Sequence, residues 1–396
     1  MSVRKRVLKS GKICWQVDYT DQSGKRRSKQ YALQRDAKAF DVQARGQIAI
    51  GTHVADAASC TVAEAGEIWI KDGQREGLEA TTITQRDQHV RLHIVPRIGG
   101  IKLSKLSTPM VEEFKDSLID GLSRALARAV LTSFKGIIRV AQIKGLIGSN
   151  PAAAVRITKR RTETVVTVVD DDDEGEVKIL GKDQIRAMLA KASEIWPLTR
   201  IVHGRWVKGV GRPERHVVMP WCPMFITTLF TGLRASELRG LTWNRVDFDN
   251  QEIKIRQRAD RYGRIGPPKT ATSRREVAMA PAVMAALREW RLVCPESEMD
   301  LVFPAESSRV ILHTNLLNQG FKPLLVACGI EESFGYHVLR HTAASLFIEQ
   351  GWQPKKIQTV MGHSSITVTY DRYGHLFPSP DDDAEAMAQM QARLLG

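Results

Sequence analysis

Three short segments in the C-terminal half carry side chains that suit chemistry on a phosphate. The first, FTGLRASELRG, places Arg234 and Glu237 three positions apart, behind the turn residue Gly232. On a helix these two side chains share one face, so the carboxylate can hold the guanidinium while its planar fork binds a phosphate. For an isolated pair of this kind, the alternative is a surface ion pair.

The second segment, KIRQRADRYGRIGPPKTATSRREVAM, predicts two strands that flank a turn rich in glycine and proline. Lys269 lies just before the second strand, followed by Ser273, Arg274 and Arg275. A lysine on a hairpin is commonly a solvated edge residue.

The third segment runs from YHVLRHTAASLF to MGHSSITVTYDRYGHLF and combines histidine, arginine and tyrosine. His337 and Arg340 stand three positions apart on a predicted helix. His363 lies in a tight turn, and Tyr370 and Tyr373 follow it by seven and ten positions. Any one of these histidines, taken alone, also fits a hydrogen-bonded residue of a core.

Taken together, the segments resemble the C-terminal signature of the tyrosine recombinases, the phage integrase family. That signature is an arginine after a TG-L element, a hairpin lysine, His-x-x-Arg, a Gly-His turn and a nucleophilic tyrosine, and all five elements occur here in order. The resemblance covers residues 180–380 strongly, 60–155 more loosely and 1–55 least. It implies a catalytic set, which is Arg234, Lys269, His337, Arg340, His363 and Tyr373.

The resemblance also implies roles. Tyr373 would attack a DNA phosphodiester and form a 3′-phosphotyrosyl intermediate. Arg234 and Arg340 would bind the non-bridging oxygens, and Lys269 would protonate the leaving 5′ oxygen. No cofactor is expected, because the phosphotyrosine keeps the bond energy and the reaction then needs neither ATP nor a metal. The sequence agrees, since it holds no Walker-type glycine loop and no cluster of metal-ligand residues.

The two histidines and the choice of tyrosine follow from the same resemblance. His337 would assist proton transfer, and His363 would donate a hydrogen bond to the scissile phosphate. Tyr373 is favoured over Tyr370 because the family tyrosine usually lies in a YxH element, which is YGH here. Many relatives carry an aspartate where this chain has Val338, so one local hydrogen bond of the family is not expected.

The chain that positions these residues is expected to be multidomain and mainly α, with small β elements. Residues 1–55 predict three short strands and a helix from Gln34 to Ile48, similar to an arm-type DNA-binding domain. Residues 60–157 predict helices, similar to the SAM-like core-binding domain. Residues 158–179 form an acidic linker, and residues 180–396 form the catalytic domain. The two larger domains would close as a clamp around duplex DNA.

Helix boundaries in the second domain are predicted from capping and breaking residues. Thr61 and Glu64 form a capping box at the start of the first helix. The second helix is expected to end at Pro96 and Gly99, and the last helix is expected to run to Asn150.

Charge points to a polyanion as the partner. The chain has 58 Lys and Arg against 44 Asp and Glu, a net charge of +14. No stretch approaches the roughly 18 uninterrupted apolar residues of a membrane-spanning helix, and the basic N-terminus has no apolar h-region. Five scattered cysteines argue against a disulfide framework, so a cytoplasmic location is expected.

Basic residues gather at two places that suit DNA contact. One set lies among the aromatic residues of the predicted sheet, and the other lies along the last helix of the second domain. The candidates are Lys25, Arg26, Arg27, Lys29, Arg128, Lys135 and Arg139. The alternatives are a solubilising β module and a solvated face of a helical bundle.

Three further segments each have two alternative interpretations. The acidic tract at 170–176 is either a flexible tether or a phosphate mimic that folds onto the DNA channel. Residues 200–220 insert a basic loop that either reaches DNA or is solvated. The helix predicted over Ala384 to Leu395 packs either on a neighbouring protomer or on its own domain.

The expected function is that of a site-specific recombinase, an integrase that moves a prophage or mobile element. Its expected partners are double-stranded DNA attachment sites and accessory DNA-bending proteins. It is expected to assemble as a homotetramer on paired sites and not to bind a membrane. The competing functions are a DNA-binding protein without catalysis, which would have lost a catalytic residue, and a type IB topoisomerase, which shares the chemistry.

Overall fold

The chain forms two compact units, Met1–Glu163 and Thr164–Gly396. The computed structural model describes residues 2–8, 12–21, 24–51, 53–54, 59–158, 178–197, 199–203, 214–331, 333–377 and 383–395. The acidic tract at 170–176 and residues 204–213 of the inserted loop therefore lie outside the described residues. The finer division of the first unit at residues 55–60 stays a prediction.

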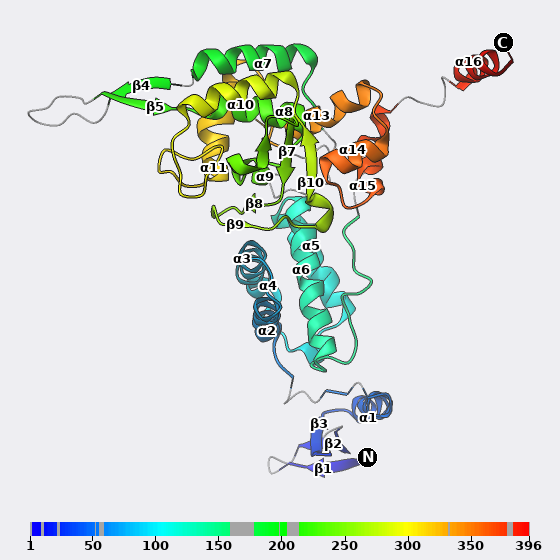
Figure 1. Cartoon of the computed structure of the whole chain (residues 1–396). Coiled ribbons are helices and arrows are strands. Elements are labelled where there is room, and N and C mark those ends of the chain that lie inside the picture. The colour runs from blue at the N-terminus through cyan, green and yellow to red at the C-terminus, as the bar shows by residue number, and fades with distance from the viewer. Residues whose placement is uncertain are drawn as a thin grey trace, which may run out of the picture. The chain divides into compact units, whose positions relative to one another are not determined.

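The first unit begins with a three-stranded antiparallel sheet in the order β1-β2-β3 (Figure 1). The strands are β1 (Ser2–Val7), β2 (Ile13–Thr20) and β3 (Arg26–Tyr31), and α1 (Gln34–Ala49) follows them. Val17 and Tyr19 are two positions apart and are both buried, on one face of β2. Phe40 of α1 packs against Tyr19 with ring centroids 5.6 Å apart, so α1 covers this face.

Helices make up the rest of the first unit. They are α2 (Val62–Arg75), α3 (Ala80–Gln88), α4 (Val95–Ile98), α5 (Thr108–Gly121) and α6 (Arg124–Ile143). The predicted capping box is present, because Glu64 accepts from the Thr61 amide at 2.7 Å and Thr61 accepts from the Glu64 amide at 3.2 Å. Gly136 lets α6 approach α2, since a Cβ there would lie 3.0 Å from the Trp69 ring.

Of the two predicted helix ends in this unit, the end at Gly99 is confirmed, because α4 ends at Ile98, and the end at Asn150 is wrong. The helical path continues through Pro96, which lies at the start of α4 after a π-helical turn, His89–Ile94. A proline has no amide hydrogen to donate to the preceding turn, and the change of register at the π turn lets the helix continue past it. The last helix ends at Ile143 rather than Asn150, and Gly145 follows in the left-handed region at φ 69°.

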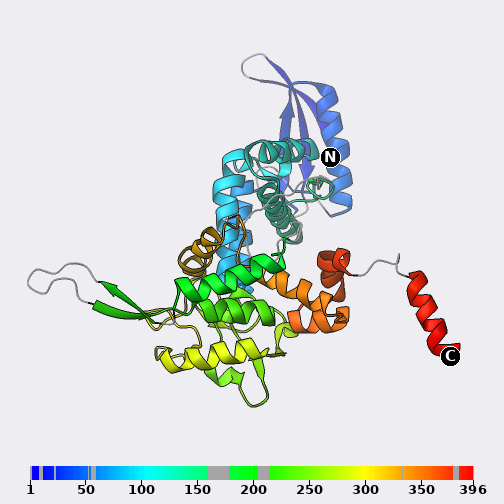
Figure 2. The ribbon, with the colours of Figure 1, turned by 90° about the horizontal axis from the view of Figure 1, so that it is seen from above.

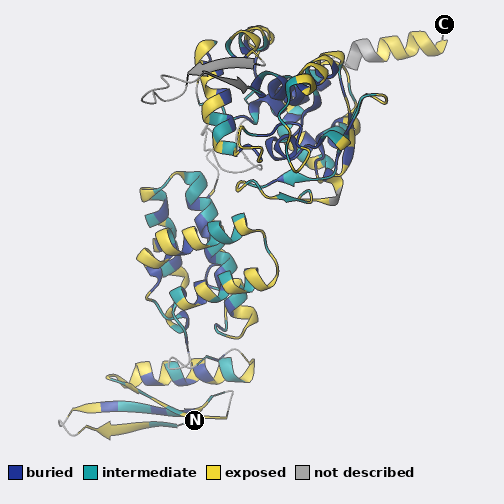
Figure 3. Ribbon diagram, turned by 60° about the vertical axis from the view of Figure 1, so that its left-hand side comes forward, coloured by how far each residue is buried: buried dark blue, intermediate teal, exposed yellow. Residues whose placement is uncertain are grey.

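The second unit is built around one buried helix, α8 (Trp221–Thr231). A helix that is apolar on all sides belongs in the centre of a domain. α7 (Lys182–Ile195), α10 (Pro281–Val293) and α13 (Val338–Glu349) contact it. Phe225 of α8 lies within 6.2 Å, between ring centroids, of Trp196, Phe321 and Tyr336. Figure 3 shows the buried residues gathered inside each unit.

Short strands complete the second unit. β6 (Val246–Asp247), β7 (Glu252–Ile255) and β10 (Arg275–Ala278) form a sheet in the order β10-β7-β6. Between β7 and β10 the chain makes a second hairpin, β8 (Arg258–Ala259) with β9 (Ile265–Gly266). β4 (Thr199–His203) and β5 (Glu214–Val218) form a further hairpin that extends away from the helices of this unit (Figures 1 and 2).

The remaining helices follow the chain to its C-terminal region. They are α9 (Ala235–Arg239), α11 (His313–Asn315), α12 (Lys322–Ala327), α14 (Pro354–Met361), α15 (Ile366–Tyr373) and α16 (Asp383–Leu395). None of the helices in the described ranges is long and apolar enough to cross a membrane.

Candidate active site

Arg234 is positioned by the tight junction between α8 and α9. Gly232 ends α8 in the left-handed conformation at φ 65°, and a Cβ there would lie 2.7 Å from the sulfur of Met361. Glycine is therefore required at this turn for both its backbone angle and its size. Arg234 follows as the residue that precedes the first turn of α9.

Glu237 is a buried carboxylate that binds two arginines. It accepts from the Arg234 side chain at 3.0 Å and from the Arg234 amide at 2.9 Å. Arg275, the first residue of β10, donates to both oxygens of Glu237 at 2.9 Å. Burial raises the pKa of this carboxyl, but Arg275, Arg234 and Arg340 outweigh it and hold the pKa at about 2. Glu237 is therefore ionised and holds both guanidinium groups in place.

The C-terminal end of α14 binds three arginines. Its last carbonyl groups have no partner within the helix and carry the negative end of its dipole. Arg275 donates to the Val360 carbonyl at 2.5 Å, Arg340 to the Met361 carbonyl at 2.5 Å, and Arg234 to the Gly362 carbonyl at 3.0 Å. Arg340 also donates to the Gly232 carbonyl. These bonds bring α8, α9, α13, α14 and β10 together at one point.

This cluster carries an excess of buried positive charge. Arg340 is buried, and its hydrogen bonds go to carbonyl oxygens, whereas Arg275 is paired with Glu237. Burial and the neighbouring Arg234 both lower the pKa of Arg340, although a guanidinium stays protonated in proteins. Three arginines against one carboxylate favour an anion, and a phosphate matches the fork of a guanidinium.

Histidines line the same region and are neutral in the free protein. Burial, followed by the charge of Arg340, lowers the pKa of His363 to about 2. Its Nδ1 lies 2.9 Å from the Thr369 hydroxyl, and within the described residues its buried Nε2 has no hydrogen-bond partner. Burial also lowers the pKa of His337 well below its ordinary range. His363 thus has a free nitrogen for a ligand of this site.

Tyr373 and Tyr370 differ in their surroundings. The side chain of Tyr373 is 0% exposed, and its hydroxyl lies 2.8 Å from Nδ1 of His341. Burial raises its pKa, and the charges of Arg340, Arg372 and Arg234 act in the opposite direction. Tyr370 is 50% exposed beside Phe377. Of the two hydroxyls, that of Tyr373 therefore lies close enough to the arginine cluster for its positive charge to act on the pKa.

Lys269 lies on the surface. It is exposed in the loop between β9 and β10, where the Thr270 hydroxyl bonds to Ser273 at 2.9 Å. β10 begins at Arg275, so this loop leads directly into the strand that enters the arginine cluster. The structure thus brings Arg234, His337, Arg340, His363 and Tyr373 into one region, with Lys269 on an adjoining loop.

The basic residues of the sheet occupy different environments. Lys25 and Arg26 are exposed. Arg27 forms an ion pair with Asp21 at 2.8 Å, and the Lys29 ammonium lies 4.6 Å from the centre of the Phe40 ring. Lys25 and Arg26 are the more accessible pair.

The basic residues of α6 also differ from one another. Arg139 is exposed, and Arg128 is partly buried. Lys135 donates to the Ala153 carbonyl at 3.3 Å, and burial lowers its pKa. Arg139 is therefore the most accessible of these three cations.

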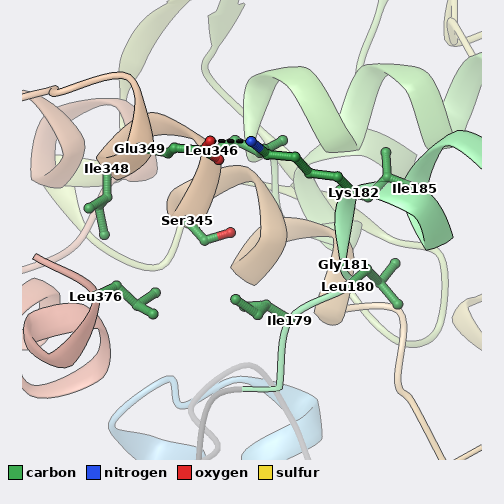
Figure 4. Close-up of a pocket in the computed structure, with 10 residues that line it drawn as sticks. All are labelled: Ile179, Leu180, Gly181, Lys182, Ile185, Ser345, Leu346, Ile348, Glu349 and Leu376. Carbon is green, nitrogen blue, oxygen red and sulfur yellow. Dashed lines mark hydrogen bonds and ion pairs between the residues drawn. The ribbon is translucent and has the colours of Figure 1, made fainter.

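Figure 4 shows a cavity elsewhere in the second unit, with a volume of about 410 Å³. Apolar side chains of the segment before α7 and of α13 line most of it, and Lys182 and Glu349 form an ion pair at its rim. None of the six predicted catalytic residues lines this cavity.

Sequence reasoning missed two residues of the site. The sequence places Arg275 only in the predicted hairpin, and its contact with Glu237 joins positions 38 apart in the chain. The five-element signature does not include His341, although this residue stands four positions after His337 on the same helix face. That spacing was the available signal.

Comparison with known proteins agrees with this geometry. Residues 223–379 match the phage integrase family, and residues 61–119 match the phage integrase N-terminal SAM-like domain. The chain belongs to the tyrosine recombinase family. The recombinase is 23% identical to a tyrosine recombinase XerC-like protein of Caldanaerobacter subterraneus subsp. tengcongensis, over 97% of this chain and 98% of that relative. Enzymes of this family cleave and rejoin DNA by transesterification.

Two solved structures share the fold of the recombinase. The Tn1549 transposon integrase, in complex with a circular intermediate DNA, has a TM-score of 0.64 and 21% identity, over 84% of this chain and 100% of that chain. The lambda integrase, as a tetramer bound to a Holliday junction, has a TM-score of 0.54 and 17% identity, over 92% of this chain and 96% of that chain. The predicted multidomain, mainly helical fold is confirmed.

Proposed function

We propose that this recombinase is a site-specific integrase that cuts and rejoins attachment-site DNA through a 3′-phosphotyrosyl intermediate at Tyr373. The Tyr373 oxygen attacks the scissile phosphorus, and the 5′ oxygen leaves. The observation that carries the proposal is the burial of the Tyr373 hydroxyl beside a cluster of three arginines with one carboxylate among them. Integration or excision of a prophage or mobile element follows when the strands of two sites are exchanged.

In this proposal Arg234 and Arg340 bind the non-bridging oxygens of the scissile phosphate. Charge builds on these oxygens in the transition state, and donors that are already fixed in place stabilise it without reorganisation. The support is the rigid hold on both groups by Glu237, Gly232 and the last carbonyls of α14.

His363 and His337 complete the phosphate site. In this proposal the free Nε2 of His363 forms a hydrogen bond with the phosphate, and His337 assists proton transfer. Because the phosphotyrosine conserves the energy of the phosphodiester bond, rejoining uses neither ATP nor a metal ion.

Lys269 is assigned as the general acid that protonates the leaving 5′ oxygen. A lysine on an exposed loop reaches a bound duplex by moving its long side chain, and the loop enters the site through β10. This assignment predicts that cleavage by a Lys269→Ala variant recovers on DNA with a bridging 5′ sulfur, which leaves without protonation.

DNA binding outside the site is assigned to the two basic sets. Lys25, Arg26, Arg27 and Lys29 on the sheet would contact arm-type sites, with Lys25 and Arg26 in the more accessible positions. Arg128, Lys135 and Arg139 on α6 would contact the core site. Phosphate contacts of this kind supply affinity and make it depend on salt.

We also propose assembly as a homotetramer on paired sites, with accessory proteins that bend the DNA. The lambda integrase tetramer on a Holliday junction is a relative in fold. On this chain, α16 exposes the apolar side chains Met387, Met390, Leu394 and Leu395, which suits packing on a second copy. A chain truncated at Pro378 should bind one site normally and fail to form tetramers. Unchanged tetramers would favour packing of α16 on its own domain.

The function is tested with a nicked suicide substrate that contains the candidate attachment site. A covalent protein–DNA adduct that needs this site is expected, and strand exchange should require a specific pair of sites. The absence of an adduct would indicate a DNA-binding protein without catalysis. Adducts and relaxation of supercoiled DNA of any sequence would indicate a topoisomerase.

A further inference from the structure

One contact of the Tyr373 hydroxyl has no role in the reaction proposed above. His341 lies on α13, immediately after Arg340 and one turn after His337. Its Nδ1 lies 2.8 Å from the Tyr373 oxygen, which is the atom that would attack the phosphate. No other hydrogen bond of this oxygen occurs within the described part of the chain.

The surroundings fix the direction of this hydrogen bond. Burial, then the charges of Arg372 and Arg340, lowers the pKa of His341 to about 3, so its ring is neutral and one nitrogen accepts. Burial raises the pKa of Tyr373, so the phenol carries its proton. A buried hydroxyl hydrogen without an acceptor costs free energy, and Nδ1 of His341 is the acceptor within reach. The Tyr373 hydroxyl therefore donates to His341.

We propose that His341 is the proton acceptor for the nucleophile Tyr373. As the Tyr373 oxygen forms its bond to phosphorus, the phenolic proton moves to Nδ1 of His341, and the bond from phosphorus to the 5′ oxygen breaks. The leaving oxygen takes a proton from Lys269. In rejoining, the 5′ hydroxyl attacks the phosphorus of the phosphotyrosine and gives its proton to Lys269, and the bond from phosphorus to the Tyr373 oxygen breaks as His341 returns its proton to that oxygen. The proposal rests on the function proposed above.

Binding of DNA would make His341 a better proton acceptor. The groups that face His341 are His337, with ring centroids 4.8 Å apart, Tyr373, and the positive charges of Arg340 and Arg372. A phosphate bound to Arg340 offsets part of the positive charge that disfavours protonated His341. Proton transfer is thereby coupled to the arrival of DNA, and the free recombinase keeps Tyr373 protonated and unreactive.

The test compares His341→Asn and His341→Ala in single-turnover cleavage of the nicked substrate. The amide oxygen of asparagine lies near the place of Nδ1 and accepts the hydrogen bond, but it does not take a proton. Both variants should cleave about 100- to 10,000-fold more slowly than the unchanged chain. Their rates should rise with pH, because ionisation of the phenol then replaces the acceptor. A His341→Asn variant that cleaves at the unchanged rate would show that His341 only positions the tyrosine and would overturn the proposal.

Controls separate this proposal from the proposed function. His375→Asn makes the same replacement on an exposed histidine two positions after Tyr373 and should leave the rate unchanged. Affinity for the DNA site and thermal unfolding show that each variant is folded. If the unchanged chain forms no adduct at all, the proposed function fails. If it forms adducts and His341→Asn matches it, only the role of His341 fails.

Discussion

At the scale of single residues, the site depends on one carboxylate. Glu237 is 2% exposed and receives hydrogen bonds on both oxygens from Arg234 and Arg275. A buried ion pair is costly to break on one side, because the partner is left charged and without compensation. Glu237 thus sets the place of the arginine that is proposed to bind the phosphate.

Glu237→Gln should lower both stability and cleavage. The amide keeps the shape but loses the charge, so the free energy of unfolding should fall by about 3 kcal/mol, as measured by urea unfolding. Cleavage should slow because Arg234 is no longer held. The control is Glu276→Gln, whose carboxylate is half exposed and pairs with Arg256 at 2.6 Å; it should cost less than about 1 kcal/mol. Equal losses in the two variants would contradict this role of Glu237.

Glu237 should also make the free energy of unfolding depend on pH in acid. The pKa of Glu237 is about 2 in the folded chain, against an ordinary value of 4.5. The folded state therefore binds this proton less readily, and its contribution is complete above pH 4.5 and lost as the pH falls toward 2. Unfolding at a series of pH values should show this loss in the unchanged chain. A Glu237→Gln variant with the same acid dependence would contradict the assignment.

Local spacing predicted part of this site. Arg234 and Glu237 are three positions apart, and the helix brings them together as expected. Arg275 approaches Glu237 only because β10 packs beside the end of α14, which depends on contacts between distant segments. Local spacing carries no information on such contacts.

At the scale of elements, the β8–β9 hairpin is fixed directly on α9. Gln257 donates to the Gly240 carbonyl at 2.8 Å, and Arg239 donates to the Ala259 carbonyl at 3.2 Å. Since Lys269 follows this hairpin by three residues, the helix that follows Arg234 also orients the proposed general acid.

Gly240→Ala should disturb this junction. A Cβ at position 240 would lie 2.7 Å from the amide nitrogen of Ala259 and 2.7 Å from the carbonyl carbon of Arg258. Backbone atoms move only together with the hairpin, so the variant should lose about 1–3 kcal/mol of stability, seen as a lower midpoint of thermal unfolding. Gly266→Ala, where nothing lies within 4 Å, is the control and should change little. A Gly240→Ala variant as stable as Gly266→Ala would contradict this packing.

Element types were easier to predict than their ends. The helix that begins at Gln34 and the capping box at Thr61 follow from local patterns, and the structure has both. The helical path through Pro96 depends on the π turn before it, and the end of α6 depends on Gly145. Several residues act together at such ends, so Asn150 alone predicted the end of α6 too late, whereas Gly99 marked the end of α4.

At the scale of the whole molecule, the net charge of +14 has separate uses. Some cations form the buried cluster around Glu237, whereas Arg26 and Arg139 are exposed on different elements. Exposed groups such as Arg26 and Arg139 are expected to contribute to the salt dependence of DNA binding, because each phosphate that they neutralise releases condensed counterions.

Arg26→Gln should weaken binding to an arm-type site and reduce the slope of log affinity against log salt by about 0.9. Successive strand residues point to opposite faces. Arg26 pairs with Thr20, and its neighbour Arg27 pairs with Tyr19, which lies under α1. Arg26 therefore lies on the face away from α1. The control is Arg35→Gln at the start of α1, with an exposed side chain, and it should leave the slope unchanged. The same slope for both variants would contradict binding by this face.

The central claim is that Tyr373 is the nucleophile, and its most direct test is the covalent adduct. The nicked substrate should be incubated with Tyr373→Phe and with Tyr370→Phe, and the adducts should be separated on a denaturing gel. Tyr370→Phe should form the adduct, and Tyr373→Phe should form none while it binds the site with unchanged affinity. An adduct from Tyr373→Phe that is lost in Tyr370→Phe would contradict the assignment and the mechanism built on it.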